Sequence, residues 1–490
     1  MAIQTDDEKQ ADSRIPTDDD VRRILIDLDD AKKVVIPPGT DEPQTFETPD
    51  GRAGWVVQIP ERRPLATPAW EAGRLFLGGG YGSYSFYGFD AGTGQRLWST
   101  KTSDDGPTAA VVEDGLVAFN TESCSIIVCE TATGKLVWER WLGDPLMSQP
   151  AIDAGRIYIA YPTGQRQPAD ESHGHHEGST TGHALLCAEL ATGETLWERP
   201  ISGDVITAPV IEGGRVYLTC FDGRSYCFET ADGNEVWVQD NRGTSAPLVV
   251  GDRVVMTEKQ DMPAMPGGAP RAPMEMLRSR RRISGADGGD HEIYVAKMAA
   301  YMDRSKSGGS PVMGDLAQGL DADVGFSSAP SSAKLEQAAA HLGVEHVAAA
   351  WAFQGSRPAY HKGRVYNAQG RHVHCVEDAK GRGRAVWEAE VNGSKVSADD
   401  QIFLPPAIAG DRIYLCSIYG HVLSIDPDVG EVDLLYDLER PLCAQPCVAK
   451  GSLYLATAMG ELIRLDTGRD DADGWYMWGG NARHNQAADA

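Results

Sequence analysis

The chain has 490 residues, of which 45 are basic and 71 acidic, and its formal net charge is −26. Such an acidic balance argues against nucleic acid or an anionic membrane as the partner, and it favours a soluble protein with an unidentified protein partner. Hydrophobic residues make up 41% of the chain, enough for a sizeable core. No run of 18 apolar residues occurs, so we expect no membrane insertion.

Residues 1–50 are polar and acidic, and we predict that they form an extension outside the main fold. Within them, VRRILIDL at 21–28 follows three aspartates and precedes two lysines, a charge order that suits a helix dipole. This pattern predicts a short amphipathic helix, which either docks on its own domain or binds a partner. The N-terminus shows no basic stretch followed by an apolar one, so no export signal is visible and we expect a cytoplasmic protein.

From about residue 51 one phrase recurs eight times: a small residue or proline, a few apolar residues, then Gly-Arg or Gly-Asp-Arg and a β-rich run. The anchor residues are spaced 42, 40, 59, 38, 111, 48 and 40 apart, and they are Pro68, Ala110, Pro150, Pro209, Pro247, Pro358, Pro406 and Pro446. A shortest anchor spacing near 40 residues, with two longer spacings, indicates one four-stranded unit repeated around a ring. We therefore predict an all-β fold over residues 51–474, an eight-bladed β-propeller of four-stranded antiparallel blades.

Four units close on the same phrase, an acid, a Thr-Gly or Asp-Gly turn, and a tryptophan eight residues after the acid, as in DAGTGQRLW at 90–98. The glycine four residues before each tryptophan suits a tight hairpin with positive φ. A tryptophan at one fixed place per unit is best explained as a wedge between neighbouring blades, with its indole N–H bonded to the next blade. The predicted structural interblade residues are Trp98, Trp138, Trp197, Trp237 and Trp387. Tyr436 takes the equivalent place in a later unit.

The last unit, from Pro446, supplies about three strands, whereas WVVQIP at 55–60 resembles a fourth strand without a unit of its own. We predict that this segment pairs with the last unit and closes the ring, which removes two sheet edges. Two units carry inserts, at about 162–183 and 260–343, and the second insert is expected to rebuild the outer half of the fifth unit. Residues 475–490 form a C-terminal segment.

The nine cysteines show no pair-of-pairs spacing typical of a metal site. Four of them occupy one repeated place in the third strand of a unit: Cys129, Cys187, Cys227 and Cys375. A thiol at a repeated position is a small apolar packing group, so we predict a structural role in a reduced compartment.

The phrase Asp-x-x-Thr-Gly-x-x-x-Trp at 90–98 and its copies resemble the tryptophan-docking repeats of quinoprotein (PQQ-type) and BamB-type propellers, and GWYMWGGNARHN at 474–485 resembles their terminal segment. The resemblance covers about 51–485 without the inserts. It implies the fold rather than an activity, because the motif is a packing device. An active member would need PQQ with calcium or a lanthanide; no metal-ligating Glu or Asn is assignable by motif here.

The first insert gathers imidazoles at His173, His175, His176 and His183, which could bind zinc, copper or nickel or could belong to a plain polar loop. The second insert carries a basic cluster, Arg278, Arg280, Arg281 and Arg282, and Arg357 follows it. These arginines are candidates for binding an anionic partner; the alternatives are that they pair with the chain's own acids or expose Ser284 to a kinase.

We find no nucleophile–base or phosphate-loop motif, so no catalytic residue is assigned. The sequence favours a non-catalytic binding or assembly scaffold without a cofactor. A quinone- or metal-dependent oxidoreductase and a BamB-like envelope assembly factor are the alternatives.

Overall fold

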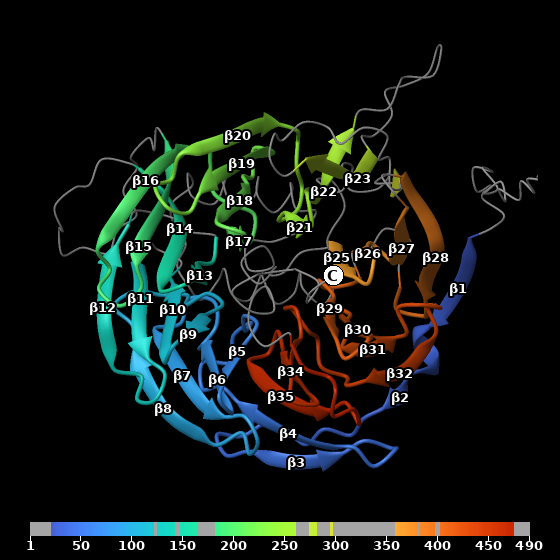
Figure 1. Cartoon of the computed structure of the whole chain (residues 1–490). Helices are drawn as coiled ribbons and strands as arrows, with labels where there is room; N and C mark the ends of the chain where they lie inside the picture. Colours follow the sequence, from blue (N-terminus) through green and yellow to red (C-terminus); the bar gives the residue numbers. More distant parts are fainter. Residues whose placement is uncertain are drawn as a thin grey trace, which may run out of the picture.

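The structure, a computed structural model, describes residues 21–121, 125–142, 148–163, 182–260, 274–281, 295–296, 358–379, 382–396 and 402–474. These residues form eight β-sheets around a ring (Figure 1). The predicted all-β propeller is therefore confirmed. Helical structure in the described ranges is the three-residue 3-10 helix η2 (Leu28–Asp30), so no helix there is long enough to cross a bilayer.

We number the sheets as blades 1 to 8 in the order of their innermost strands. Blade 1 is β5 (Ala69–Glu71), β6 (Arg74–Gly78), β7 (Ser85–Asp90) and β8 (Arg96–Lys101). Blade 2 is β9 (Val111–Glu113), β10 (Leu116–Asn120), β11 (Ser125–Glu130) and β12 (Leu136–Trp141). Blade 3 is β13 (Ala151–Asp153), β14 (Arg156–Pro162), β15 (His183–Glu189) and β16 (Thr195–Ile201). Blade 4 is β17 (Val210–Glu212), β18 (Arg215–Thr219), β19 (Arg224–Glu229) and β20 (Glu235–Asp240).

The other four blades vary this plan. Blade 5 is β21 (Leu248–Val250), β22 (Arg253–Gln260), β23 (Met274–Arg281) and the short β24 (Val295–Ala296). Blade 6 is β25 (Pro358–His361), β26 (Arg364–Gln369), β27 (His372–Ala379), β28 (Arg382–Asn392) and an added outer strand, β1 (Arg22–Asp27). Blade 7 is β29 (Ala407–Ala409), β30 (Arg412–Cys416), β31 (His421–Ile425), β32 (Val432–Asp437) and the added β2 (Lys32–Lys33). Blade 8 is β33 (Cys447–Ala449), β34 (Ser452–Ala456), β35 (Glu461–Asp466), β4 (Ala53–Gln58) and β3 (Gln44–Glu47).

Position within a blade explains the residue pattern of each strand. The third strand β11 is buried at every residue except the last, because the neighbouring blades cover both of its faces. The outer strand β12 alternates between exposed and half-buried residues. Strands that are covered on both faces read as continuous apolar runs, and half-covered strands alternate.

The ring is closed between its last and first parts. Each innermost strand contacts the innermost strand on either side, including β33 of blade 8 with β5 of blade 1. Strand β4 pairs antiparallel with β35, from Gly54 opposite Leu465 to Gln58 opposite Glu461. The predicted closure by the segment at 55–60 is confirmed: an early strand completes the last sheet.

The segment from Arg22 to Glu47, which we call the strap, corrects two predictions. It forms three strands that extend the outer edges of blades 6, 7 and 8 in turn (Figure 1). The helix predicted at 21–28 is instead the strand β1, which pairs in parallel with β28, followed by η2. The predicted division at residue 50 is also wrong, because the strap belongs to the propeller sheets. Ile24, Ile26 and Leu28 recur every second residue, and this spacing suits a strand on a sheet edge.

The first insert lies between β14 and β15 and the second begins after β22, whereas the predicted end of the second insert lies outside the described residues. In blade 3, β14 ends opposite the start of β15, with Pro162 paired to His183, and the residues between 163 and 182 lie outside the described ranges. In blade 5, β23 lies within the second insert and pairs along its whole length with β22. The insert therefore supplies the outer half of this blade, as the missing tryptophan phrase suggested.

Candidate functional site

Five tryptophans each join their blade to the next one through a single backbone carbonyl. The carbonyl belongs to the residue directly after the acid that opens the closing turn of the next blade; we call it the docking carbonyl. The indole N–H donates to it over 2.7–3.3 Å in five pairs: Trp55 to Ala91, Trp98 to Thr131, Trp138 to Leu190, Trp197 to Thr230 and Trp387 to Pro427. Trp237 is also buried, and its ring packs against Tyr217 at 6.2 Å between centroids. Trp55, in the closing strand β4, takes the same role, which our sequence analysis did not assign to it.

The turn glycine of the next blade lies directly under each indole. Gly193 has φ +72°, and a Cβ added there would lie 2.9 Å from Cδ2 of Trp138. At Gly134 the corresponding atom would lie 2.4 Å from Cε3 of Trp98. Glycine is therefore required twice at this position, for the left-handed backbone and for the approach of the ring.

The arginine of the repeated Gly-Arg phrase reaches the same carbonyl in two blades. Arg156 donates through Nη1 to the carbonyl of Thr230 at 2.7 Å, the acceptor that Trp197 also uses. Arg364 donates to the carbonyl of Pro427 at 3.3 Å and to the carboxylate of Asp428 at 2.9 Å. From the sequence we predicted no contact for this arginine, which marks the repeat. Its fixed place beside the closing turn was the signal for a second interblade contact.

The seam between blades 7 and 8 uses a tyrosine in place of tryptophan. Tyr436 is buried, and its hydroxyl donates to the carboxylate of Asp50 in the turn that joins β3 and β4. Burial by itself would raise the pKa of Asp50, but hydrogen bonds from Thr48 and Tyr436 and the charge of Arg52 lower it to about 2. Blade 8 has no continuous closing turn because β35 and β4 come from opposite ends of the chain, and the turn between β3 and β4 supplies the acceptor instead.

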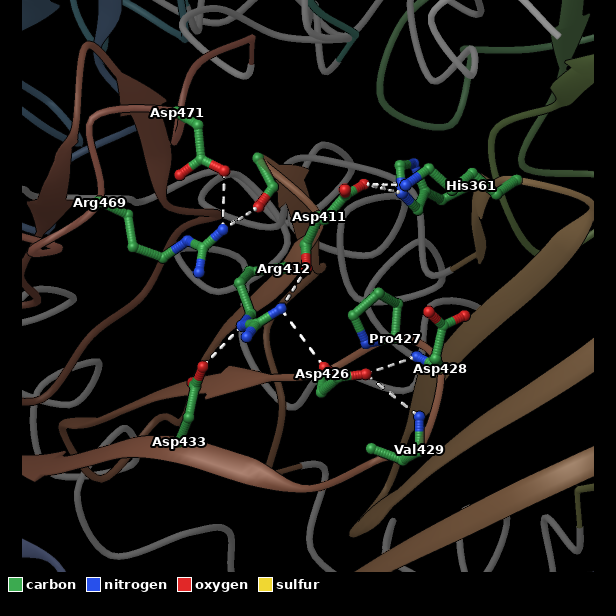
Figure 2. Close-up of polar contacts among 12 residues, drawn as sticks. His361, Asp411, Arg412, Asp426, Pro427, Asp428, Val429, Asp433, Arg469 and Asp471 are labelled. Atoms are coloured by element: carbon green, nitrogen blue, oxygen red, sulfur yellow. Dashed lines mark hydrogen bonds and ion pairs between the residues drawn. The ribbon is translucent and has the colours of Figure 1, made fainter.

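A network of charged residues joins the turns of blades 6, 7 and 8 on one face (Figure 2). His361 contacts the carboxylate of Asp411 in the next blade at 2.7 Å, and Lys362 bonds the same carboxylate at 2.6 Å. The hydrogen bonds from Lys362 and His361 lower the pKa of Asp411. Arg469 of blade 8 donates to the carbonyl of Gly410 at 3.0 Å. These contacts tie successive blades together and are partly exposed, so each adds little stability alone.

Within blade 7 the arginine of the repeated phrase organises the closing turn. Arg412 contacts Asp433 at 2.6 Å and Asp426 at 3.4 Å, both in its own blade (Figure 2). Asp426 in turn accepts from the backbone N–H groups of Asp428 and Val429 at 2.8 and 3.2 Å. The acid that opens the turn therefore fixes the turn's backbone, which presents the docking carbonyl of Pro427 to Trp387.

The repeated cysteines pack inside the blades. The eight cysteines among the described residues are buried, and no disulfide joins any two of these. Burial raises the pKa of the Cys129 and Cys375 thiols to about 12. Thiols with so high a pKa stay protonated at neutral pH and are poor nucleophiles and metal ligands.

The candidate metal and partner-binding residues are largely outside the described ranges. This holds for His173, His175, His176, Arg282 and Arg357. His183 is the first residue of β15. Arg278, Arg280 and Arg281 lie in β23, opposite Met256, Val254 and Arg253 of β22. Within the described residues, no group of three or more His, Cys, Asp or Glu side chains is placed to hold a metal ion. Both assignments stay predictions.

The ring of repeated blades, the tryptophan–carbonyl contacts and the turn glycines together define a PQQ-like β-propeller repeat protein. A family model described as outer membrane protein assembly factor BamB matches residues 85–177, 178–268 and 370–488. These matches cover more than half of the chain, and the chain belongs to this family of PQQ-type repeats.

The similar curated proteins match part of the chain. The outer membrane protein assembly factor BamB of Nitrosomonas eutropha is 20% identical over 225 residues, which are 43% of this chain and 49% of that protein. The BamB of Burkholderia pseudomallei is 23% identical over 257 residues, 44% of this chain and 63% of that protein. The chain thus spans about half to three-fifths of the relatives it matches.

Solved structures resemble the whole ring. BamB from Moraxella catarrhalis matches with a TM-score of 0.52 and 13% identity, over 84% of this chain and 96% of that one. A computationally designed protein matches with a TM-score of 0.53 and 11% identity, over 83% and 96% of the two chains. A natural assembly factor and a designed protein match about equally well, so this likeness shows the fold and no activity.

Proposed function

We propose that the protein is a non-catalytic scaffold that binds other proteins on a rigid propeller ring. The supporting observation is that the repeated polar and sulfur-containing groups are engaged in holding the ring. The indole of Trp197 and the guanidinium of Arg156 share the docking carbonyl of Thr230, and the Cys129 thiol is buried and protonated. The loops and the outer faces of the blades are then the surfaces left for binding. Because the ring is rigid, these surfaces need little ordering when a partner binds.

The names of the relatives support a role in protein assembly. Both curated relatives are called outer membrane protein assembly factors, so proteins are the partner class that the comparisons favour. An envelope assembly role like theirs is the second candidate. Because the chain spans only part of their length, this role is kept as the alternative and the general scaffold as the proposal. The cytoplasmic location expected from the sequence stays a prediction.

Cross-linking of the intact protein in cell extract, followed by mass spectrometry, tests the proposal. We expect a reproducible set of partner peptides cross-linked to the propeller. A variant that lacks residues 297–343 is the comparison, since it keeps β23 and β24 and therefore blade 5. Loss of a partner assigns that partner to the second insert; an unchanged set places the contacts on the ring.

The competing class, a quinone- or metal-dependent oxidoreductase, is tested on the same purified protein. Its ultraviolet–visible spectrum and metal content are measured after purification and again after incubation with PQQ and calcium. A quinone absorption band together with stoichiometric calcium would overturn the scaffold proposal. An unchanged protein spectrum with cross-linked partners present is the result we expect.

A further inference from the structure

The outer edge of blade 6 is built differently from the edges of blades 1 to 3. In those blades the residue two places after the tryptophan covers the next blade's turn glycine and bonds its carbonyl. Thr100 donates to Gly134 at 2.6 Å, Arg140 to Gly193 at 2.7 Å, and Arg199 to Gly233 at 2.8 Å. Each of these edges is closed by its own side chain.

In blade 6 the equivalent residue is Ala389, which is too short to cover Gly430. A strap residue takes this place: a Cβ added at Gly430 would lie 2.3 Å from Cδ1 of Ile24 and 2.8 Å from Cδ2 of Trp387. Ile24 lies opposite Ala389 in the parallel pairing of β1 with β28. The groove at this edge is therefore lined by Trp387, Ala389 and Gly430, and an aliphatic side chain from another segment fills it.

We propose that this groove is a binding site for an extended segment of a partner protein, and that the strap occupies it in the absence of the partner. The site accepts a parallel strand whose backbone pairs with β28 and whose aliphatic side chains enter at every second residue. The inference rests on the scaffold function proposed above and names one surface and one class of partner for it.

The contacts of the strap define the chemistry of the partner. Ile26 and Leu28 are buried against blade 6, whereas Leu25, between Ile24 and Ile26, is 66% exposed. Arg22 pairs with Glu431 at 2.5 Å, two residues before Ile24. A matching partner segment carries a basic residue followed by aliphatic residues at the second, fourth and sixth positions after it. A basic residue also suits a chain whose net charge is −26.

The first part of the strap can leave without opening the ring. Strand β1 is the outermost strand of its sheet, and blade 6 keeps its own four strands without it. Ordering the six residues of β1 costs chain entropy comparable to the gain from covering its two inward aliphatic side chains, Ile24 and Ile26. Outer segments held on so narrow a margin open locally far more often than the core.

The test uses a protein that lacks residues 1–30 and a fluorescein-labelled peptide of residues 21–30, VRRILIDLDD. We expect saturable binding by fluorescence anisotropy, and at least tenfold weaker binding to the intact chain, whose own strap competes. Ile24→Asp in the peptide is expected to abolish binding. The matched protein control is Ala389→Arg in the shortened chain, which copies the arginine that closes the edges of blades 2 and 3.

Equal affinity for the Ala389→Arg protein, or no binding to a shortened protein that keeps its cooperative melting, would overturn the proposal. Should the shortened protein not fold, amide exchange in the intact chain decides. We expect the slowest-exchanging amide of β1 to exchange at least a hundredfold faster than those of β27; an equal rate for this amide and those of β27 excludes a displaceable strap. These readouts concern the strap alone, whereas cross-linking and the spectrum judge the scaffold function.

Discussion

The indole N–H of Trp197 and the guanidinium of Arg156, both in blade 3, donate to one carbonyl oxygen, that of Thr230 in blade 4, at 2.9 and 2.7 Å. Trp197 is 6% exposed and sits over Gly233 of the same turn. The docking carbonyl therefore receives two hydrogen bonds from the neighbouring blade, and the turn is also covered by an apolar ring. Repeated around the ring, such contacts hold the blades against one another.

Removing the ring of Trp197 should destabilise the protein strongly. We expect Trp197→Ala to lower the free energy of unfolding by about 3–5 kcal/mol, because it leaves a cavity between two blades. Trp197→Phe keeps most of the apolar packing and loses the N–H donor, while Arg156 still serves the carbonyl, so its cost should be near 1 kcal/mol. Urea unfolding followed by circular dichroism measures both. Equal costs for the two variants would contradict the packing role.

The turn glycines under the indoles should tolerate no side chain. Gly193→Ala places a Cβ 2.9 Å from the ring of Trp138 and also strains a backbone with φ +72°. Gly155 has the same φ with no atom within 4 Å, so Gly155→Ala isolates the backbone strain. We expect about 1 kcal/mol for Gly155→Ala and about 1–3 kcal/mol more for Gly193→Ala. The melting temperatures of the two variants test this expectation. Similar decreases for both would show that the close approach of the Trp138 indole to the added Cβ costs no stability.

Acid should weaken the fold through a buried histidine in blade 6. Burial, and then the charge of His372, lower the pKa of His374 to about 3. In the unfolded chain the pKa of histidine is near 6.5, so the unfolded state binds more protons between these values. The stability from the neutral ring is complete above pH about 6.5 and falls by up to about 1.4 kcal/mol per unit as the pH drops toward 3.

Unfolding free energies of the wild type and His374→Gln, measured by urea between pH 7.5 and 4.5, test this expectation. Whatever its stability at pH 7.5, the variant should show a flatter dependence of unfolding free energy on pH than the wild type below pH 6.5. Parallel curves would mean that His374 does not contribute to the acid sensitivity.

The stability of the contact between blades 7 and 8 should depend on the hydroxyl of Tyr436. Tyr436→Phe removes its hydrogen bond to Asp50 and leaves the ring packed in the seam. We expect a loss of about 1 kcal/mol, since Asp50 is partly solvated. The pKa of Asp50, followed by carboxyl NMR, should rise from about 2 toward its usual value. An unchanged pKa would show that the hydrogen bond does not hold the carboxylate.

Much of the propeller fold could be predicted because each repeat carries the residues that form its hairpin and its contact with the next blade. A tryptophan eight residues after an acid, with a glycine between them, predicts a tight hairpin in its own blade. It also predicts an indole that packs on the corresponding hairpin of the next blade. The closing role of the segment at 55–60 followed from counting strands. The role of Trp55 was missed because its unit is split between the two ends of the chain, and no closing phrase precedes it.

The strap shows where local reasoning failed. Residues 21–28 carry charges that suit a helix dipole, yet they form a strand. Ile24, Ile26 and Leu28 fit either a helix or a strand over so short a run. In the structure Ile24 lies opposite Ala389 and packs over Gly430, and contacts with residues more than 360 positions away cannot be inferred from the local pattern.

By itself the sequence determined the repeated hairpin, its tryptophan and glycine, and hence the closed propeller, because these are set by contacts between neighbouring repeats of the same pattern. The tertiary structure alone decided which edges stay open to solvent and which carry the strap. At blade 6 the strap residue Ile24 packs over Gly430, where blades 1 to 3 use a side chain of their own, and this contact appears only when distant parts of the chain meet.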